Sequence, residues 1–346
     1  MNVVFRVDSS IHMGIGHLMR CLSLAGELRA KDILVKFICS NLPGNQAGIL
    51  EKKGYTVHLL PYNASQTEVQ QTINIVEQEV CKVDWIIIDH YAIDEPWEKQ
   101  LRPYIKRIMV IDDLANRRHD CDLLLDQNYY DNMKSRYEGL VSNHCRKLLG
   151  PKYALLRPEF LWERKNLRTR DGLIRRILIF YGGTDPGNET EKALKAIREL
   201  NLPGVAIDVV VGSTNPNRVR IGELCSSIPG VSFYCQVDNM AQLTANADLA
   251  LCAGGSATHE RCMLGLPSIV TIIADNQLET TAALDKAGAV RSIGLSRDVT
   301  VKKIADAVAE AIANPEAVRD IGKRALQLTA EHISVAEMIL EETNAK

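Results

Sequence analysis

The segment after the first apolar run of the chain is rich in side chains that could do chemistry. NVVFRV leads into DSSIHMGIGHLMR, whose polar residues are Asp8, Ser9, Ser10, His12, His17 and Arg20. Gly14 and Gly16 lie where the chain turns from strand to helix, and ligands collect at that edge of an α/β sheet. His17 and Arg20 are three residues apart, so they share a helix face. We therefore expect a site here in which the substrate contacts include Asp8, Gly14, Gly16 and Arg20.

His17 is the candidate general base of this site. A neutral imidazole that takes a proton from water or from a hydroxyl group contributes roughly 10²- to 10⁴-fold to a rate. A nicotinamide-cofactor site is disfavoured, because Met19 stands where a GxGxxG fingerprint needs its third glycine. The alternative remains open that the glycines only form a tight turn and that His17 is a surface residue.

Two further apolar runs end in polar residues. WIIIDHY places Asp89, His90 and Tyr91 at a strand end, and IMVIDD does the same for Asp112 and Asp113. Such residues often only begin a loop, although the carboxyl ends of parallel strands meet at one edge of a sheet. The carboxylates lack the spacing of a DxD or HExxH motif, so we predict no required metal.

The second half of the chain contains a glycine-rich turn, FYGGTDPGN, between a predicted strand and a predicted helix. The backbone N–H groups of Gly182, Gly183 and Thr184 could face an anion at the N-terminus of that helix. The turn lacks the GK[ST] ending of a Walker loop. We expect Gly183 and Thr184 to contact the ligand.

A second glycine-rich turn, LCAGGSATHE, places Ser256 before a helix that carries Glu260 near its first turn. The sequence around Ser256, GGSAT, lacks the final glycine of a nucleophile elbow. We therefore expect Ser256 to contact the ligand and not to act as a nucleophile. Two turns that could bind an anion suit a nucleoside diphosphate. Glu260 could then accept hydrogen bonds from the ribose hydroxyls. The alternative for Glu260 is an ordinary first-turn carboxylate that the helix dipole favours. In the following TIIADNQ, Asp275 could cap a helix and Gln277 could contact ligand.

Strand-length apolar runs alternate with helix-length segments along the whole chain. The runs are NVVFRV, ILVKFIC, WIIID, IMVID and DLLLD in the first half, and RILIFY, VAIDVVVG, VSFYC, ADLALC and PSIVTII in the second. They are continuous rather than alternating, which is typical of parallel strands that are covered on both faces. The predicted fold class is α/β, with two Rossmann-like domains that face a cleft.

A charged stretch after Phe160, WERKNLRTRDGLIRR, has little apolar periodicity and is the candidate linker. We therefore expect an N-terminal domain at residues 1–162, which carries the catalytic base, and a C-terminal nucleotide-binding domain at residues 173–346. Three helices are expected to close the chain, beginning near Val301, Pro315 and Val335.

The composition excludes several classes of protein. Lys and Arg number 41 against 43 Asp and Glu, and the formal charge of −2 gives no basic field for a nucleic-acid partner. No run approaches the roughly 20 apolar residues of a membrane span, and Arg6 and Asp8 interrupt any signal-peptide core, so we expect no membrane partner. Nine cysteines without a CxxC pair indicate a cytoplasmic protein. The sequence identifies no protein partner.

Several motifs together resemble one family. FRVDSSIHMGIGHLMRCLSLA, IIDHY, YALLRPEF, GGTDPGN, SATHE and DNQ follow one another in this order. In this order they resemble the UDP-2,4-diacetamido-2,4,6-trideoxy-β-L-altropyranose hydrolases of pseudaminic acid biosynthesis and the related spore-coat polysaccharide proteins. The resemblance spans nearly the whole chain. The N-terminal block and the GGTD turn are its specific parts, whereas SATHE and the glycine-rich turns are shared with many glycosyltransferases of the two-domain GT-B fold.

The resemblance implies hydrolysis of a UDP-sugar at the anomeric C–O bond, with inversion and without a metal or another cofactor. It implies that His17 is the base, that Arg157 and Glu260 contact the nucleotide sugar, and that Tyr91 lies at a cleft position. The residues leave two alternatives open. One is a GT-B glycosyltransferase, which places an acceptor hydroxyl where the hydrolase places water, and the other is a nucleotide-sugar-binding protein without turnover.

Overall fold

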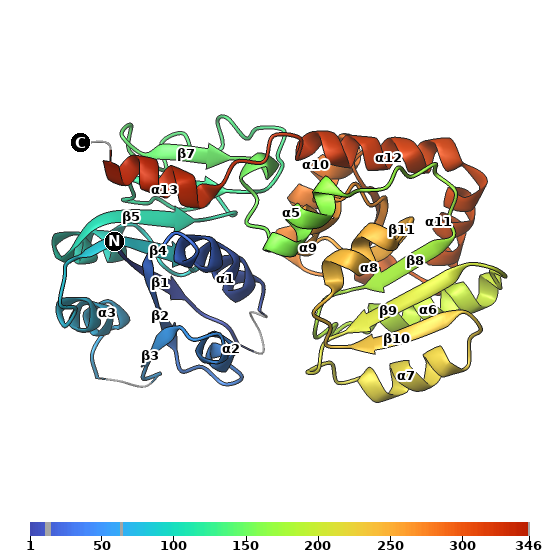
Figure 1. Ribbon diagram of the computed structural model, residues 1–346, viewed down its shortest axis with the longest axis horizontal. Helices are drawn as coiled ribbons and strands as arrows, with labels where there is room; N and C mark the ends of the chain where they lie inside the picture. The colour runs from blue at the N-terminus through green and yellow to red at the C-terminus, as the bar shows by residue number, and fades with distance from the viewer. Residues whose placement is uncertain (11–14, 63–64, 345–346) are drawn as a thin grey trace. The chain divides into compact units, whose positions relative to one another are not determined.

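The computed structural model describes residues 1–10, 15–62 and 65–344 of the 346-residue chain. The chain divides into two compact units (Figure 1). Unit 1 contains Met1–Leu156 and His332–Lys346, and unit 2 contains Arg157–Glu331. Each unit is built on a sheet of parallel strands with helices along the connections, so the predicted α/β class with two Rossmann-like sheets is confirmed.

Unit 1 has a seven-stranded parallel sheet in the order β3-β2-β1-β4-β5-β6-β7. Its strands are β1 (Asn2–Val7), β2 (Leu34–Ser40), β3 (Thr56–Leu60), β4 (Val83–Asp89), β5 (Ile105–Ile111), β6 (Leu123–Asp126) and β7 (Arg146–Leu149). Its helices are α1 (Gly16–Arg29), α2 (Ala47–Lys52), α3 (Glu68–Glu77), α4 (Glu95–Leu101), η1 (Arg102–Tyr104), η2 (Pro151–Tyr153) and α13 (Val335–Asn344). The strand order reverses between β1 and β4.

The central strand β1 is buried on both faces, which explains its continuous apolar run. Phe5 belongs to the same apolar cluster as residues of α1 and α13. Val4, which points to the opposite face, packs with residues of α3 and α4. Because successive side chains of a strand alternate between faces, a strand covered on both sides is apolar at most positions. The buried Arg6 of β1 is an exception, and its guanidinium bonds to Asp8.

Unit 2 has a six-stranded parallel sheet in the order β10-β9-β8-β11-β12-β13. Its strands are β8 (Arg176–Phe180), β9 (Ala206–Val211), β10 (Val231–Cys235), β11 (Leu249–Ala253), β12 (Ser268–Ile272) and β13 (Arg291–Leu295). Its helices are α5 (Pro158–Lys165), α6 (Glu189–Leu200), α7 (Arg218–Ser226), α8 (Met240–Asn246), α9 (Ala257–Met263), η3 (Asp275–Gln277), α10 (Leu278–Lys286), η4 (Ser296–Asp298), α11 (Val301–Ala313) and α12 (Pro315–Leu328). The strand order reverses between β8 and β11.

The boundaries of the two units differ from the predicted domains 1–162 and 173–346. The last helix, α13, lies on unit 1 and contacts α1 (Figure 1). Ile339 of α13 is fully buried in the apolar cluster of unit 1, and the Trp85 Nε1 donates a hydrogen bond to the Thr343 Oγ1 at 2.7 Å. Unit 2 is therefore an insertion into unit 1, between β7 and α13.

The predicted linker is also part of unit 2. Arg170 lies in this charged stretch, and its guanidinium donates hydrogen bonds to main-chain carbonyl oxygens of Thr244, Ala247 and Leu264 at 2.5 to 3.1 Å. Burial, followed by the charge of Arg168, lowers the pKa of Arg170 to about 10. The charges of this stretch thus hold the ends of α8 and α9, and the chain passes between the units at Leu156–Arg157 instead.

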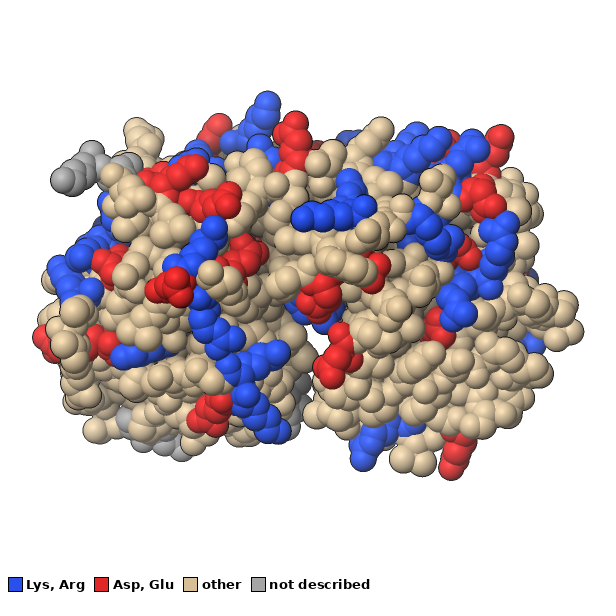
Figure 2. Space-filling model, in the orientation of Figure 1, with Lys and Arg blue, Asp and Glu red and all other residues tan. Residues whose placement is uncertain are grey.

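Acidic and basic side chains are interspersed on the face that Figure 2 shows, in keeping with the small formal charge of −2. Within the described ranges, no helix combines the length and the apolar character needed to cross a membrane.

Candidate active site

The topological switch point of unit 1 brings two strand ends together. Asp8 directly follows β1, and Asp89 is the last residue of β4, whose Cα pairs with that of Val7. Ligands of open α/β sheets bind at such a point, outside the carboxyl ends of the strands. The next helix, α1, begins at Gly16, so its first turn carries His17 toward the same edge.

His17 and Asp89 form a hydrogen-bonded pair. The His17 Nδ1 lies 2.7 Å from the Asp89 Oδ1, and both side chains are buried. Burial opposes ionisation of Asp89, but Arg20 and His17 outweigh it and hold the pKa of this carboxyl well below its usual range. An ionised carboxylate only accepts hydrogen bonds, so the Nδ1 donates and the lone pair of the neutral ring lies on the Nε2. This is the tautomer that a general base needs, with Asp89 as the group that orients it.

Arg20 binds both oxygens of the same carboxylate. Its Nε lies 2.6 Å from the Asp89 Oδ2, its Nη2 lies 2.6 Å from the Asp89 Oδ1, and its Nη1 donates to the Asp113 Oδ2 at 2.9 Å. The Arg20 Nη2 also approaches the His17 Nδ1 at 3.0 Å, but two donors do not bond each other. The structure thus engages Arg20 with protein carboxylates, and its predicted substrate contact stays a prediction.

Asp8 has a similar internal role. Its Oδ1 accepts from the Arg6 Nη1 and from the backbone N–H of Ser40, and its Oδ2 accepts from the Arg6 Nη2. Burial opposes ionisation, yet His90 and Arg6 hold the pKa of Asp8 well below its usual range. These bonds give Asp8 a structural role at the end of β1, and its predicted contact with substrate stays a prediction.

A second histidine–aspartate pair lies at the same strand ends. The His90 Nε2 lies 3.2 Å from the Asp8 Oδ2, and the His90 Nδ1 accepts the backbone N–H of Ala92 at 3.2 Å. Both ring nitrogens of His90 are thereby used, whereas the Asp89 bond of His17 engages only the Nδ1. Of these two imidazoles, the geometry favours His17 as the base.

The remaining predicted residues of unit 1 lie as follows. The ring of Tyr91 meets that of His17 edge to face, with centroids 4.6 Å apart and planes at 88°. Gly16 is the first residue of α1 and is partly exposed. Gly14 and His12 lie outside the described residues. Asp89 and Asp113 are the residues of this site to which the sequence assigned no role, and their signal was their position at the ends of apolar strands.

The GGTD turn of unit 2 follows β8 at the second switch point. Gly182 has a φ of 95°, and the Gly183 carbonyl accepts the N–H of Gly212 at 2.9 Å. A Cβ on Gly212 would lie 2.6 Å from that carbonyl oxygen, so the two loops approach closely only because this residue is glycine. Thr184, at the outer side of the turn, is exposed.

The helix that follows this turn differs from the expected anion site. α6 begins at Glu189, five residues beyond Thr184, and the carboxylate of Asp185 accepts the N–H groups of Glu189 and Thr190 at 2.9 and 2.8 Å. The protein's own carboxylate thus occupies the positive end of the helix. We therefore expect a ligand anion to contact the turn itself and not the N-terminus of the helix.

The GGSATHE turn and Gln277 lie together. The Gln277 Oε1 accepts the N–H of Ile273 at 3.1 Å, and its side chain packs against Gly254 and Gly255. A Cβ on Gly254 would lie 2.3 Å from the Thr281 Oγ1, so glycine is required there. Exposed Ser256 precedes α9 and, within the described part of the chain, makes no side-chain capping bond.

Arg157 and Glu260, both predicted as nucleotide-sugar contacts, are bonded to each other. The Arg157 Nε donates to the Glu260 Oε1 at 2.9 Å, and the guanidinium also lies over the ring of Phe160, 4.8 Å from its centroid. Burial raises the pKa of Glu260 against the opposing effect of Arg157. The pair ties the first residue of unit 2 to α9.

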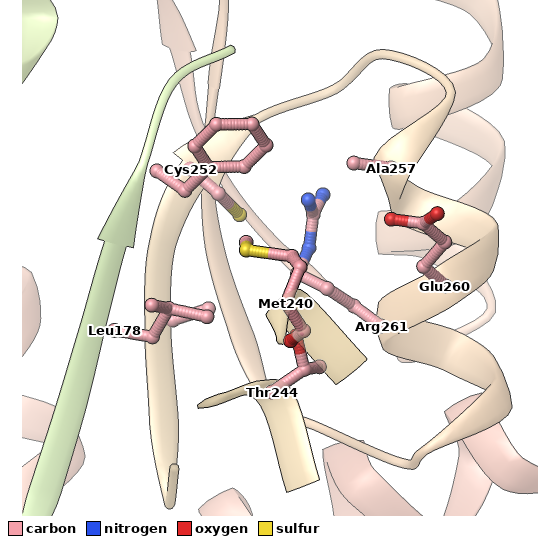
Figure 3. A pocket seen from close by; sticks show the side chains of 9 residues that line it. Leu178, Met240, Thr244, Cys252, Ala257, Glu260 and Arg261 are labelled. Atoms are coloured by element: carbon pink, nitrogen blue, oxygen red, sulfur yellow. The ribbon is translucent and has the colours of Figure 1, made fainter. Parts of the chain in front are cut away.

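A pocket of about 240 Å³, which includes open solvent, lies between the sheet of unit 2 and two of its helices. Figure 3 shows Glu260 and Arg261 of α9 on one side and Leu178 and Cys252 of the strands on the other. The lining residues are Leu178, Phe180, Met240, Thr244, Ala250, Cys252, Ala257, Glu260 and Arg261. Among the residues that the structure describes, no group of three or more His, Cys, Asp or Glu side chains is placed to hold a metal ion.

The two parallel sheets define an α/β protein of the GT-B class. Solved structures of this class are similar over almost the whole chain: MurG of Acinetobacter baumannii (TM-score 0.66, 13% identity, 98% of this chain and 99% of that chain) and LpCGTa in complex with UDP (TM-score 0.66, 12% identity, 100% and 99%). These likenesses show the fold.

Sequence relatives narrow the class to a family. The chain is 30% identical over 290 residues to the UDP-2,4-diacetamido-2,4,6-trideoxy-β-L-altropyranose hydrolase of Campylobacter jejuni, covering 83% of this chain and 97% of that protein. It is 24% identical to the spore coat polysaccharide biosynthesis protein SpsG of Bacillus subtilis, over 85% of this chain and 84% of that one. No protein-family model matches the chain. The chain belongs to the family of the Campylobacter jejuni hydrolase.

Proposed function

We propose that this protein hydrolyses UDP-2,4-diacetamido-2,4,6-trideoxy-β-L-altropyranose to UDP and the free sugar, as a step of pseudaminic acid biosynthesis. Its membership in the family of the Campylobacter jejuni hydrolase supports this substrate. The observation that carries the proposal is the His17–Asp89 pair, with an Nδ1–Oδ1 distance of 2.7 Å at the switch point of unit 1. The nine free cysteines support a cytoplasmic setting for the reaction.

The reaction needs a base that acts on water. A water proton passes to the His17 Nε2 as the water oxygen forms its bond to the anomeric carbon. The bond from that carbon to the β-phosphate oxygen breaks, and its electron pair leaves with UDP. Attack from the face opposite the leaving group inverts the anomeric configuration. The Asp89 carboxylate stabilises the imidazolium that forms, through the Nδ1–H bond that also fixes the ring.

Unit 2 supplies the nucleotide-binding residues in this proposal. The partly exposed turn of Gly183 and the exposed side chains of Thr184 and Ser256 offer donors to the diphosphate. Gln277, packed on the GGSATHE turn, and Glu260, held by Arg157, offer polar groups to the nucleoside. UDP is a good leaving group once its charge is stabilised by such donors, so we expect the reaction to proceed without a metal ion.

The test is UDP release from the substrate with no acceptor and with EDTA present. Wild-type protein should release UDP, and His17→Ala should be slower by roughly 10²- to 10⁴-fold, the usual contribution of a general base. His144→Ala is the matched control, because this histidine is exposed and its hydrogen bond is to Ser142. It should keep the wild-type rate.

The products separate the remaining possibilities. In water labelled with ¹⁸O, label in the sugar and not in UDP supports cleavage of the C–O bond, and NMR of the first anomer formed reports inversion. UDP release that requires an acceptor sugar would replace the hydrolase by a glycosyltransferase, the activity found among solved relatives of this fold such as the Rickettsia africae glycosyltransferase. Tight binding without any release would leave a nucleotide-sugar-binding protein.

A further inference from the structure

Arg20 is bound to the orienting carboxylate of the candidate base and not to a free position in the site. Two of its nitrogens contact the two oxygens of Asp89 at 2.6 Å each, and the third contacts Asp113 at 2.9 Å. Arg20 is itself buried, with 7% of its surface exposed, and Asp89 has none exposed. Charge–charge interactions are stronger in such a buried cluster than at the surface.

The arrangement places three alternating charges in a row beside the imidazole. Asp89 is negative and contacts His17, Arg20 is positive and contacts Asp89, and Asp113 is negative and contacts Arg20. An isolated carboxylate would strongly favour the protonated imidazole, which cannot accept a proton from water. A guanidinium that is bonded to both oxygens of that carboxylate, and lies 3.0 Å from the ring nitrogen itself, reduces this preference.

We propose that Arg20 is a positioning residue that acts through Asp89: it fixes the carboxylate that orients His17, and it offsets the negative charge of that carboxylate beside the ring. Asp113 in turn moderates Arg20. The proposal rests on the proposed function, because that function makes His17 the base. The electrostatic interaction among these side chains can be tested without substrate.

The surroundings of the ring are shared among several elements. The groups that face His17 or its carboxylate partner are Arg20 and Cys21 on α1, Asp89 at the end of β4, Tyr91 after β4, and Asp113 after β5. The Cys21 Sγ lies 3.5 Å from the Asp89 Oδ2, and burial, followed by the charge of Asp89, raises the pKa of this thiol well above its usual value. Cys21 therefore adds no charge, and the row from Asp89 to Asp113 dominates.

The experiment follows the protonation of His17 by ¹H–¹⁵N NMR in the substrate-free protein, with the resonance assigned by its loss in His17→Ala. Arg20→Gln removes the positive charge, and we expect the midpoint to move to higher pH by about one unit, the usual size for one neighbouring charge. Arg20→Lys keeps the charge and should restore most of the wild-type midpoint. Asp113→Asn removes the opposing charge and should move the midpoint to lower pH.

Arg102→Gln is the matched control. Arg102 also pairs with two carboxylates of unit 1, Asp120 and Asp122, but it begins η1, which precedes β5 at the opposite end of the strands from Asp89. Its loss should leave the midpoint unchanged. An equal shift in this variant would mean that any lost ion pair perturbs the ring, which would overturn the proposal.

Kinetics with the UDP-sugar add a second readout. In Arg20→Gln the acid limb of the kcat/KM profile should move with the NMR midpoint, and kcat should fall while KM stays near the wild-type value. A raised KM with an unmoved midpoint would make Arg20 a substrate contact and sink the proposal. If Arg20→Gln fails to fold, Arg20→Lys and Asp113→Asn carry the test by the direction of their shifts. Wild-type protein without UDP release would overturn the proposed function and leave the titration result standing.

Discussion

At the scale of single residues, three buried aspartates of unit 1 show how the neighbourhood decides ionisation. Asp89 lies 2.6 Å from Arg20, and an arginine beside Asp8 has the same effect, so both carboxyls stay ionised. Asp126 lies 3.5 Å from the Arg136 Nε, a distance beyond good hydrogen bonding. Burial then dominates and raises the pKa of Asp126 to about 7.

This shift predicts a pH dependence of stability. Between the ordinary aspartate pKa near 3.9 and about 7, folded protein holds a proton on Asp126 that unfolded protein has lost. The contribution of Asp126 to the free energy of unfolding should therefore be present at acid pH and decline as the pH rises to about 7. Urea unfolding of wild type and Asp126→Asn at pH 5.5 and 8.0 measures it. We expect the variant to gain stability relative to wild type at pH 8.0, and an equal difference at both pH values would contradict the assignment.

At the scale of elements, the start of α6 shows how a helix end can be satisfied from within. Asp185 is fully buried and lies in the left-handed region with a φ of 40°, which Asp and Asn tolerate better than most residues. From there its carboxylate reaches the first two N–H groups of the helix. The preceding turn, which carries Gly183 and Thr184, is thereby held in place.

Asp185→Ala should lower the free energy of unfolding by about 1–2 kcal/mol, because it removes the cap and places alanine in a left-handed conformation. Asp185→Asn is the matched control, since asparagine keeps an acceptor oxygen and tolerates the backbone conformation; its loss should be smaller. Chemical denaturation monitored by circular dichroism compares the three proteins. Equal losses in both variants would mean that the charge of Asp185, and not its capping geometry, stabilises the helix.

At the scale of the whole molecule, the order of the chain and the order of the units do not coincide. The C-terminal helix α13 returns to unit 1, where Val335, Ala336 and Ile339 are buried beside α1. The Ser334 Oγ also donates to Glu27 at 2.8 Å. Unit 1 therefore includes a segment, residues 332–346, that follows all of unit 2 in the sequence.

Removal of residues 332–346 should destabilise unit 1 selectively. The deletion exposes the apolar surface of α1 and leaves the Trp85 Nε1 without its bond to Thr343. Hydrogen exchange should then speed up at the amides of β1 and β4 and stay near the wild-type rate in β8 and β11. Ile339→Ala leaves a cavity in the same apolar face. It should also destabilise unit 1, lowering the free energy of unfolding by about 2–5 kcal/mol. Equal acceleration in both units would show that α13 stabilises the chain as a whole.

Much of the fold could be predicted from the sequence because buried parallel strands need apolar residues at most of their positions. The runs of β1, β4, β5 and β11 were recognised for this reason, as were the three closing helices by their start and stop residues. The edge strands β3, β7 and β13 were missed. β7, with the sequence RKLL, is exposed at its first two residues, so it has no continuous apolar run to recognise.

The candidate site was predicted in part. Residue type and position at a strand end singled out His17, and spacing placed Arg20 on the same helix face, but neither could show what each side chain contacts. Asp89 was noted as an ordinary strand-end residue, whereas its 2.7 Å contact makes it the partner of His17. Asp8 and Arg20 are predicted to contact substrate, and the sequence did not show that both also bond to charged groups of the protein.

The sequence by itself determined the α/β class, the strand-to-helix turns and the candidate base, because each follows from local patterns: apolar runs, glycine turns and a histidine at a helix start. Tertiary structure alone decided which carboxylate faces His17, how Asp8 and Arg20 are used, and where α13 packs. These depend on contacts between residues far apart in the chain, such as His17 with Asp89 and Trp85 with Thr343. The local sequence of an amphipathic helix or of a strand-end carboxylate does not identify its partner, since the same local pattern is compatible with many ways of packing.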